Sequence, residues 1–415
     1  MALSRFLLIS ASFAVIAACS GGGEREGETT YIEDDASSTE PGEEAEAIWR
    51  AASEEDAGDK FTYANYDEIR VTHVDLDLDV DFEAKVISGT ATLDFERRDE
   101  TADMLVLDAN DLDIELVEAQ VDGDWLTAGY ELGPDDAVMG SRFAIDLPEG
   151  AEQVRVTYAT SPDAEGIQWL SPEQTAGKEH PYLFSQFQPL YARTMVPLQD
   201  TPAVRITYDA HLTTPPELLA VMSARQDEDG DRDGDYSFKM SQPIPSYLLA
   251  LAIGDIDFKR ISDHMGVYAE DYILDEAAEE FEDTPRMEEA IEDLYGPYRW
   301  GRYDQIVLPP SFPFGGMENP RLSFMTPTLI AGDKSLTNVV AHELAHSWSG
   351  NLVTNSNWRD AWLNEGFTSY VENRTMEALY GPERAAMERS LDKKSLMEDV
   401  AAAERPELTA LKMPA

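Results

Sequence analysis

Two histidines four residues apart, His342 and His346, flank a glutamate in the segment from Val339 to Trp348. On a helix their rings lie about 40° apart on one face, so both can bind one metal ion. Glu343 is rotated about 100° from His342, which keeps it out of the ligand set but close enough to hold a water molecule. Two histidine ligands beside a carboxylate base are typical of a zinc hydrolase.

A tetrahedral zinc ion that does chemistry needs a third protein ligand and one open position for water. Glu365 lies 19 positions after His346, in the segment Trp362-Leu-Asn-Glu-Gly366. The eighteen residues between them allow one helix to end and a second to return antiparallel. Glu372 follows two turns later on the same face, where a carboxylate can orient a ligand histidine such as His342.

Helices must carry these ligands. The helix of the two histidines can be capped by Asp333 or Ser335, and Gly350 is placed to end it. The helix that carries Glu365 is predicted to run to the stop signal Gly381-Pro382. The apolar stripe of the first helix consists of Leu336, Val339, Val340 and Leu344. Further predicted elements are helices at 275–281, 285–295 and 383 to about 403, and a strand at 306–308.

A histidine pair at this spacing is often only solvated, or packed in a core without a metal. The glutamate at the matching distance, and an apolar helix on each side, favour the metal site over that alternative.

Strand patterns dominate the first half of the chain. Residues 74–82 alternate between apolar and acidic side chains without error, as expected for a strand with one buried and one wet face. We predict an antiparallel β domain over residues 63–257. Its other strand-like runs are 86–95, 104–107, 114–121, 153–158, 204–211, 218–222 and 236–240.

These motifs resemble the zinc aminopeptidase family of aminopeptidase N and leukotriene A4 hydrolase. The resemblance is carried by His342-Glu-Leu-Ala-His346, the gap to Glu365 and the upstream Gly315-Gly-Met-Glu-Asn319. Residues 308–320 and 327–335 are similar to the leukotriene A4 hydrolase branch in particular. The resemblance implies an α+β fold in which the N-terminal β domain precedes a thermolysin-like, mainly helical zinc domain over residues 258–415, with one Zn²⁺ per chain.

The same resemblance assigns substrate contacts. It implies that Glu318 grips the free α-ammonium of the substrate, with Gln188 beside it as a hydrogen-bond partner and Gln186 nearby. The backbone N–H groups of Gly315 and Gly316 can approach a substrate strand closely because glycine has no side chain. By composition alone, alternating glutamines in a strand are more often solvent-facing.

The expected activity is removal of N-terminal residues from short peptides. Glu343 would act as general base toward a water molecule activated by zinc held by His342, His346 and Glu365. Two alternatives stay open. The chain could be a catalytically impaired fragment that binds zinc or peptide while tethered to a membrane, or it could hydrolyse an epoxide.

Two departures from the family pattern stand out. Phe314 occupies the position at which the leukotriene A4 hydrolase branch has tyrosine. Only 50 residues follow Glu365, so the tyrosine that stabilises the oxyanion in the family, and the helical domain after it, would lie beyond this chain. We therefore expect a C-terminally truncated catalytic domain. Tyr370 and Tyr380 are expected to be packing residues.

Length and charge bound the remaining choices. At 415 residues the chain is long enough for two domains, and a mean hydropathy of −0.37 excludes a multi-span membrane protein. With 31 basic and 82 acidic residues the net charge is −51, which opposes binding to nucleic acid and to anionic lipid surfaces. Adaptation of the protein to a salty medium would explain such an acidic surface equally well. We expect peptide substrates, no nucleic-acid partner and a monomer.

The N-terminus resembles a lipoprotein signal. Residues 1–18 hold a short basic start and a mostly apolar run too short to span a bilayer, and Ile16-Ala-Ala-Cys19 resembles a bacterial lipobox. Cys19 is the one cysteine and would carry the lipid. Residues 19–62 are predicted to be an acidic disordered tether. The predicted location is therefore the bacterial cell envelope, anchored to the outer membrane and facing the periplasm; an ordinary secretory peptide is the alternative.

Overall fold

The structure is a computed structural model that describes residues 58–228 and 230–411. Its N-terminal domain is built on a seven-stranded sheet in the order β13-β11-β1-β2-β8-β4-β5. Neighbouring strands are antiparallel except β1 and β11, which are parallel. The strands are β1 (Ile69–Asp81), β2 (Val86–Arg97), β4 (Asp113–Val121), β5 (Asp124–Thr127), β8 (Ala151–Ala159), β11 (Arg205–Thr213) and β13 (Asp235–Pro245).

Strand β1 shows why this sheet forms. Val74, Leu76, Leu78 and Val80 are buried on one face, and the aspartates between them are exposed on the other. An extended chain places successive side chains on opposite faces, so the alternating sequence gives one apolar face and one wet face. The strand predicted at 74–82 is confirmed, and it begins earlier, at Ile69.

Two smaller sheets complete the N-terminal domain. A three-stranded sheet has the order β3-β7-β6, and a four-stranded sheet has the order β12-β14-β10-β9. The strands are β3 (Met104–Ala109), β6 (Tyr130–Leu132), β7 (Ser141–Asp146), β9 (Ile167–Leu170), β10 (Tyr182–Ser185), β12 (Leu219–Met222) and β14 (Leu251–Gly254).

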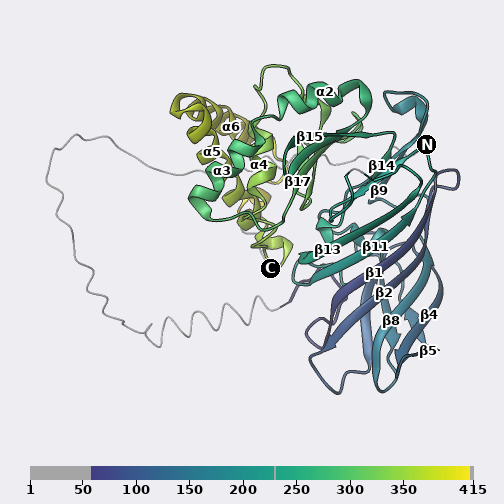
Figure 1. Cartoon of the computed structure of the whole chain (residues 1–415). Helices are drawn as coiled ribbons and strands as arrows, with labels where there is room; N and C mark the ends of the chain where they lie inside the picture. Colours follow the sequence, from purple (N-terminus) through teal and green to yellow (C-terminus); the bar gives the residue numbers. More distant parts are fainter. Residues whose placement is uncertain (1–57, 229, 412–415) are drawn as a thin grey trace, which may run out of the picture.

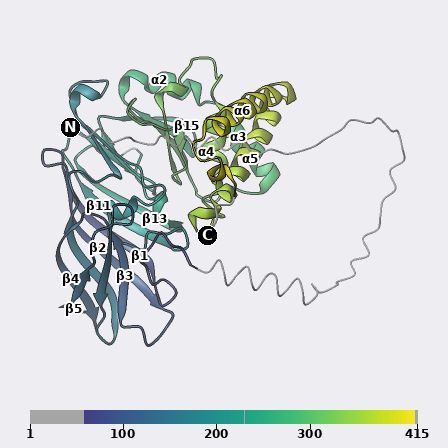
Figure 2. The ribbon, with the colours of Figure 1, turned by 180° about the vertical axis from the view of Figure 1, so that it is seen from behind.

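The second domain packs helices on a five-stranded mixed sheet with the order β15-β16-β17-β19-β18. In both views this sheet lies between helices α3 to α6 and the strands of the N-terminal domain (Figures 1 and 2). The elements are β15 (Asp257–Ser262), β16 (Met265–Ala269), α2 (Asp271–Glu280), α3 (Thr284–Tyr295), β17 (Tyr303–Val307), β18 (Gly316–Met317), β19 (Leu322–Met325), α4 (Asn338–Ala345), α5 (Trp362–Tyr380) and α6 (Pro382–Ala402).

The apolar core of the N-terminal domain extends into the second domain, which also has a core cluster of its own beneath helices α2 to α5. The large cluster of the β domain continues onto Phe312, Met317 and Phe324 of the second domain. Phe184 on β10 meets Phe312 edge to face, with ring centroids 5.9 Å apart. The short strand β18 is therefore pressed between the N-terminal domain and the helices. This position lets both domains contribute to one site.

The predicted α+β fold is confirmed, with differences in detail. One strand pair, β1 and β11, is parallel, because an alternating pattern indicates which face is buried but not the direction of the neighbouring strand. Helix α4 begins at Asn338, after both predicted caps. Asp333 accepts instead from the backbone N–H of Ser335 in a local turn, at 3.0 Å.

The boundary at residues 257 and 258 stays a prediction, and it is supported by the change of sheet between β14 and β15. Within residues 58–228 and 230–411, none of the helices has the length and apolar character that crossing a membrane requires.

Candidate metal centre and substrate site

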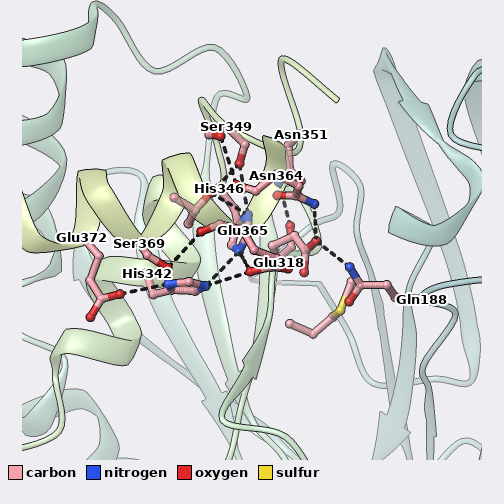
Figure 3. Close-up of polar contacts among 12 residues, drawn as sticks. Gln188, Glu318, His342, His346, Ser349, Asn351, Asn364, Glu365, Ser369 and Glu372 are labelled. Carbon is pink, nitrogen blue, oxygen red and sulfur yellow. Dashed lines mark hydrogen bonds and ion pairs between the residues drawn. The ribbon is translucent and has the colours of Figure 1, made fainter. Parts of the chain in front are cut away.

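Helices α4 and α5 bring the three predicted metal ligands together (Figure 3). The Nε2 atoms of His342 and His346 lie 3.1 Å apart. Glu365 Oε2 lies 3.4 Å from His342 Nε2 and 3.7 Å from His346 Nε2. Tetrahedral zinc with bonds of about 2.1 Å places its ligand atoms about 3.4 Å apart. The spacing of the three donor atoms therefore fits a zinc ion.

The outer nitrogen of each histidine has a partner that can only accept a hydrogen bond. His342 Nδ1 lies 3.0 Å from Glu372 Oε2, and His346 Nδ1 lies 3.0 Å from the backbone oxygen of Ser349. Each Nδ1 therefore carries the proton and directs Nε2 toward the centre. Thr368 Oγ1 also lies 3.1 Å from His346 Nδ1.

The charges at this centre favour a cation. Burial acts to lower the pKa of His342, but hydrogen bonds to Glu365 and Glu372 raise it well above its usual value. Burial lowers the pKa of His346 to about 4, so that ring is neutral. Burial alone would raise the pKa of Glu365, but the two histidines hold it below its usual range. The surroundings of these donor atoms therefore stabilise positive charge, and a bound divalent metal ion would provide that charge.

Glu343 is buried beside the metal ligands, on the turn of α4 that faces β18. A side chain at Gly316 would collide with the Glu343 carboxylate, so a larger residue there would displace this carboxylate. Among the described residues, no hydrogen bond or ion pair to this carboxylate is present. Burial raises its pKa well above the usual value. The group can therefore accept a proton from a water molecule held next to it.

Glu318 lies directly after β18 and is only 3% exposed. Its carboxylate accepts hydrogen bonds from Gln188 Nε2 and Asn364 Nδ2, both at 3.4 Å (Figure 3). Asn351 Nδ2 donates to its backbone oxygen at 2.7 Å. Burial, and then the charge of Glu365, raises the pKa of Glu318 to about 8. The contacts are long and come from neutral amides, so the carboxylate can still accept a cationic partner.

The remaining predicted substrate residues are less closely joined to this centre. Gln186 Nε2 contacts Met317 Sδ at 3.1 Å, and its Oε1 is buried without a hydrogen-bond partner. Gly315 is exposed, and a Cβ there would only touch Val339 Cγ1 at 3.5 Å. Phe314 is also exposed.

Sequence reasoning missed several residues that hold the centre. Asn364 stands next to Glu365 in the same segment, which is the signal that could have identified it. Tyr247, in the turn Ser246–Leu248, accepts from Asn364 Nδ2 at 3.4 Å, and its ring packs on Trp358 with centroids 4.9 Å apart. Nothing in its apolar surroundings distinguishes it. Asn351 also lacks a signal, because its contact depends on how the chain turns after α4.

Comparisons with known proteins agree with this geometry. A leukotriene A-4 hydrolase of Xenopus laevis is 43% identical over 335 residues, which are 78% of this chain and 54% of that protein. Leucine aminopeptidase 2 of Yarrowia lipolytica is 42% identical over 330 residues, 79% of this chain and 50% of that protein. Yeast LTA4 hydrolase in complex with bestatin has a TM-score of 0.81 at 36% identity, over 87% of this chain and 57% of the other. The chain spans about half the length of these relatives.

These relatives correct the predictions of a lipid anchor at Cys19 and of a place in a bacterial cell envelope. These relatives are a leukotriene A-4 hydrolase of Xenopus and leucine aminopeptidases and an LTA4 hydrolase of fungi, and their names do not describe an envelope lipoprotein. The signal predicted over 1–18, and most of the tether over 19–62, lie outside the described residues. The prediction was wrong because it rested on a short apolar run and one cysteine, whereas the relatives match over hundreds of positions.

Two family models cover most of the chain. The Peptidase M1 N-terminal domain matches residues 65–248, and the Peptidase family M1 domain matches residues 279–412. The second match contains both histidines, Glu343, Glu365 and Glu318, and the first contains Gln188. This chain, with its β domain and its helical metal-site domain, therefore belongs to peptidase family M1.

Proposed function

We propose that this protein is a zinc aminopeptidase that removes N-terminal residues from short peptides. One observation carries the proposal: the buried carboxylate of Glu318, held only by neutral amides, lies in the same site as a three-ligand metal centre. A buried carboxylate without a cationic partner is costly. The α-ammonium of a peptide is a cation that would fill this place. Relatives named leucine aminopeptidase and leukotriene A-4 hydrolase support the same activity.

His342, His346 and Glu365 would hold the metal, and Glu372 would keep His342 in the correct orientation. A bound zinc ion would polarise the peptide carbonyl and make a water molecule acidic near neutral pH.

Glu343 would take the proton from the attacking water. Its carboxylate is not occupied by other hydrogen bonds among the described residues, and it lies against the strand that would receive the substrate. The same group would then deliver the proton to the leaving amine, because it is the buried acid next to the cleaved bond.

Glu318, with Gln188, would fix the free amine at a set distance from the metal. An amine fixed in this way would limit the enzyme to removing residues singly from the end. A charge-assisted hydrogen bond of this kind is worth about 1.5–3 kcal/mol. Gln186 and the backbone of Gly315 and Gly316 would line the path of the substrate strand.

The test is release of a chromogenic amine from amino-acid amides by the purified chain, with free and with acetylated α-amines. We expect zinc-dependent release from the free amines only. Glu343→Gln should bind zinc normally and lose about 10²–10⁴ in kcat, because the proton acceptor is gone. Glu318→Ala should bind zinc normally and lose about 10–100-fold in kcat/KM, which corresponds to one charge-assisted bond.

Equal cleavage of acetylated substrates would contradict the role of Glu318, and undiminished turnover by Glu343→Gln would contradict the role of the base. Bestatin, which the yeast relative binds in its solved complex, offers a binding readout that does not depend on turnover. We expect wild type to bind it more tightly than Glu318→Ala. The predicted monomeric state stays a prediction.

A further inference from the structure

The loop from Ser349 to Thr354, between α4 and the turn that leads to α5, contacts both halves of the site. The backbone oxygen of Ser349 accepts from His346 Nδ1 at 3.0 Å, and Asn351 Nδ2 donates to the backbone oxygen of Glu318 at 2.7 Å. Figure 3 shows Ser349 and Asn351 on the same side of the centre, above His346 and Glu318. Displacement of this loop would therefore disturb a metal ligand and the proposed amine-binding carboxylate together.

The loop has little apolar packing of its own. Leu352 is 40% exposed and Val353 is 71% exposed. Its first half is held by its own domain: Thr368 Oγ1 donates to Ser349 O at 3.0 Å, and Asn351 N donates to His346 O at 3.0 Å. The hydroxyl of Thr354, at its end, donates to Gly350 O at 2.5 Å, within the loop itself. Gly350 has a φ of 108° and no room for a side chain, because a Cβ would collide with Asn364. A contact from outside the loop would therefore limit the movement of its second half most.

Arg205, the first residue of β11, supplies that contact from the N-terminal domain. Its Nη1 donates to Thr354 Oγ1 at 2.7 Å, and its Nη2 donates to the backbone oxygen of Asn351 at 2.7 Å. The same guanidinium is fixed on its own domain by two bonds to the backbone oxygen of Pro243, at 2.7 and 3.2 Å. Planar geometry lets one arginine serve all three acceptors at once.

The acceptors of Arg205 are all neutral. Among the described residues it forms no salt bridge, although the chain holds 82 acidic residues against 31 basic ones. In a chain with so many acidic residues, we would expect an arginine that balances charge to lie beside a carboxylate. Its four hydrogen bonds instead join a backbone oxygen of one domain to two groups of the loop, so its role is to hold a position.

We propose that Arg205 is a positioning residue, which holds the loop 349–354 so that His346 and Glu318 keep their places in the site. The inference rests on the proposed function for the meaning of those places. By this proposal, the N-terminal domain keeps the metal ligand His346 in position through Arg205, a residue that contacts neither the metal nor the substrate.

The experiment compares Arg205→Met, Arg205→Lys and a control variant, Glu228→Gln. Glu228 makes a separate charged contact between the domains, to Arg302 at 2.8 Å, which lies outside the loop. Two quantities are measured on each full-length protein: backbone hydrogen exchange of residues 349–354 in the metal-free protein, and zinc affinity by competition with a chromogenic chelator. Thermal unfolding by circular dichroism shows which variants are folded.

For Arg205→Met we expect loop exchange about tenfold faster and zinc affinity about tenfold weaker, because the loop that contains Ser349, the partner of His346, is held less firmly. Arg205→Lys keeps the charge and one bond to the loop, so its values should lie between wild type and Arg205→Met. It also provides the comparison if Arg205→Met does not fold. Glu228→Gln should match wild type in both measurements, even if it unfolds at a lower temperature.

Unchanged loop exchange in a folded Arg205 variant would overturn the proposal, as would unchanged zinc affinity or an equal effect of Glu228→Gln. The exchange comparison requires neither zinc nor turnover. A chain that releases no amine would contradict the proposed function and still show whether Arg205 holds the loop. A working aminopeptidase with an insensitive loop would contradict the role of Arg205 alone.

Discussion

The proposed chemistry would depend on three carboxylates in different surroundings, of which Glu343 and Glu318 are buried and Glu365 is half-buried. Glu365 contacts both histidines, which hold its pKa below the usual range after opposing the effect of burial. Burial raises the pKa of Glu343 and of Glu318, and these two lack a cationic hydrogen-bond partner among the described residues. The same residue type can thus serve as ligand, base and amine-binding group, since the environment of each decides its charge.

Glu372 orients His342 and gives a test at the level of one residue. Glu372→Ala should weaken zinc binding about 10–100-fold, because the ligand ring loses the acceptor that fixes its tautomer. The control is Glu377→Ala on the same helix, where the carboxylate pairs with Arg374 at 2.8 Å and is remote from the site. Competition with a chromogenic chelator measures both. Equal zinc affinity of Glu372→Ala and wild type would show that the hydrogen bond has no orienting role.

Strand β18 and helix α4 form the unit that would place the proposed base, Glu343, beside the substrate. The strand is only two residues long and lies at the edge of its sheet, and its first residue packs directly against Glu343. An edge strand leaves one side of its backbone free for another chain. The close packing at Gly316 comes from the helix behind the strand and not from a turn.

Replacing the two glycines tests this unit. Gly316→Ala should displace Glu343 and lower kcat about 10–100-fold with zinc content unchanged, because a shift near 1 Å is enough to cost about that factor. Gly315→Ala is the comparison variant, since its Cβ would meet only Val339 at an ordinary 3.5 Å and would leave Glu343 in place. Any effect of this Cβ on the substrate path should raise KM and leave kcat unchanged. Rates on amino-acid amides and zinc content by atomic absorption separate the two effects. Similar rates for both variants would refute the packing argument.

At the scale of the whole molecule, the domains also meet through an ion cluster. Arg302 pairs with Glu228 of the N-terminal domain at 2.8 Å and with Asp304 on β17 at 2.7 Å. Asp304 is buried, and burial raises its pKa to about 6 although Arg302 opposes the shift; Glu228 adds to it. The ionised carboxylate of Asp304 is thus less stable in the folded protein than in the unfolded chain.

This shift predicts a pH dependence of stability. The contribution of Asp304 is fully present below about pH 4 and is lost as the pH rises through about 6, because the unfolded chain releases the proton first. Between about pH 5 and about pH 8 it should lower the free energy of unfolding by about 1.5 kcal/mol. Asp304→Asn should lack that fall, as measured by urea unfolding at both pH values.

The control for that experiment is Asp257→Asn, which removes an exposed carboxylate paired with Arg232. Other groups titrate in every variant, so the comparison is of the change with pH and not of absolute stability. If Asp304→Asn loses as much stability as wild type over this range, the raised pKa is wrong.

Patterns with a local physical cause were predicted well from the sequence. The alternation in β1 depends on the period of two residues in a strand, and the pairing of His342 with His346 depends on the period of 3.6 in a helix. The helix that ends at Gly381 follows from a local stop signal, Gly381-Pro382. The family resemblance extended this to the fold. The prediction of a lipid anchor was wrong. It rested on one short N-terminal motif, and no residues elsewhere in the sequence could support or exclude that motif.

The tertiary structure alone decided how the two domains share the site. Arg205, Asn351 and Tyr247 stand in segments whose sequence shows no pattern of function, and their contacts join residues more than 30 positions apart. The start of α4 at Asn338 and the parallel pairing of β1 with β11 likewise depend on what packs against each element. Local sequence determines which faces of the strands and helices are apolar, and at what spacing the metal-binding side chains follow one another. The packing of one domain against the other sets which neutral groups hold those ligands in place.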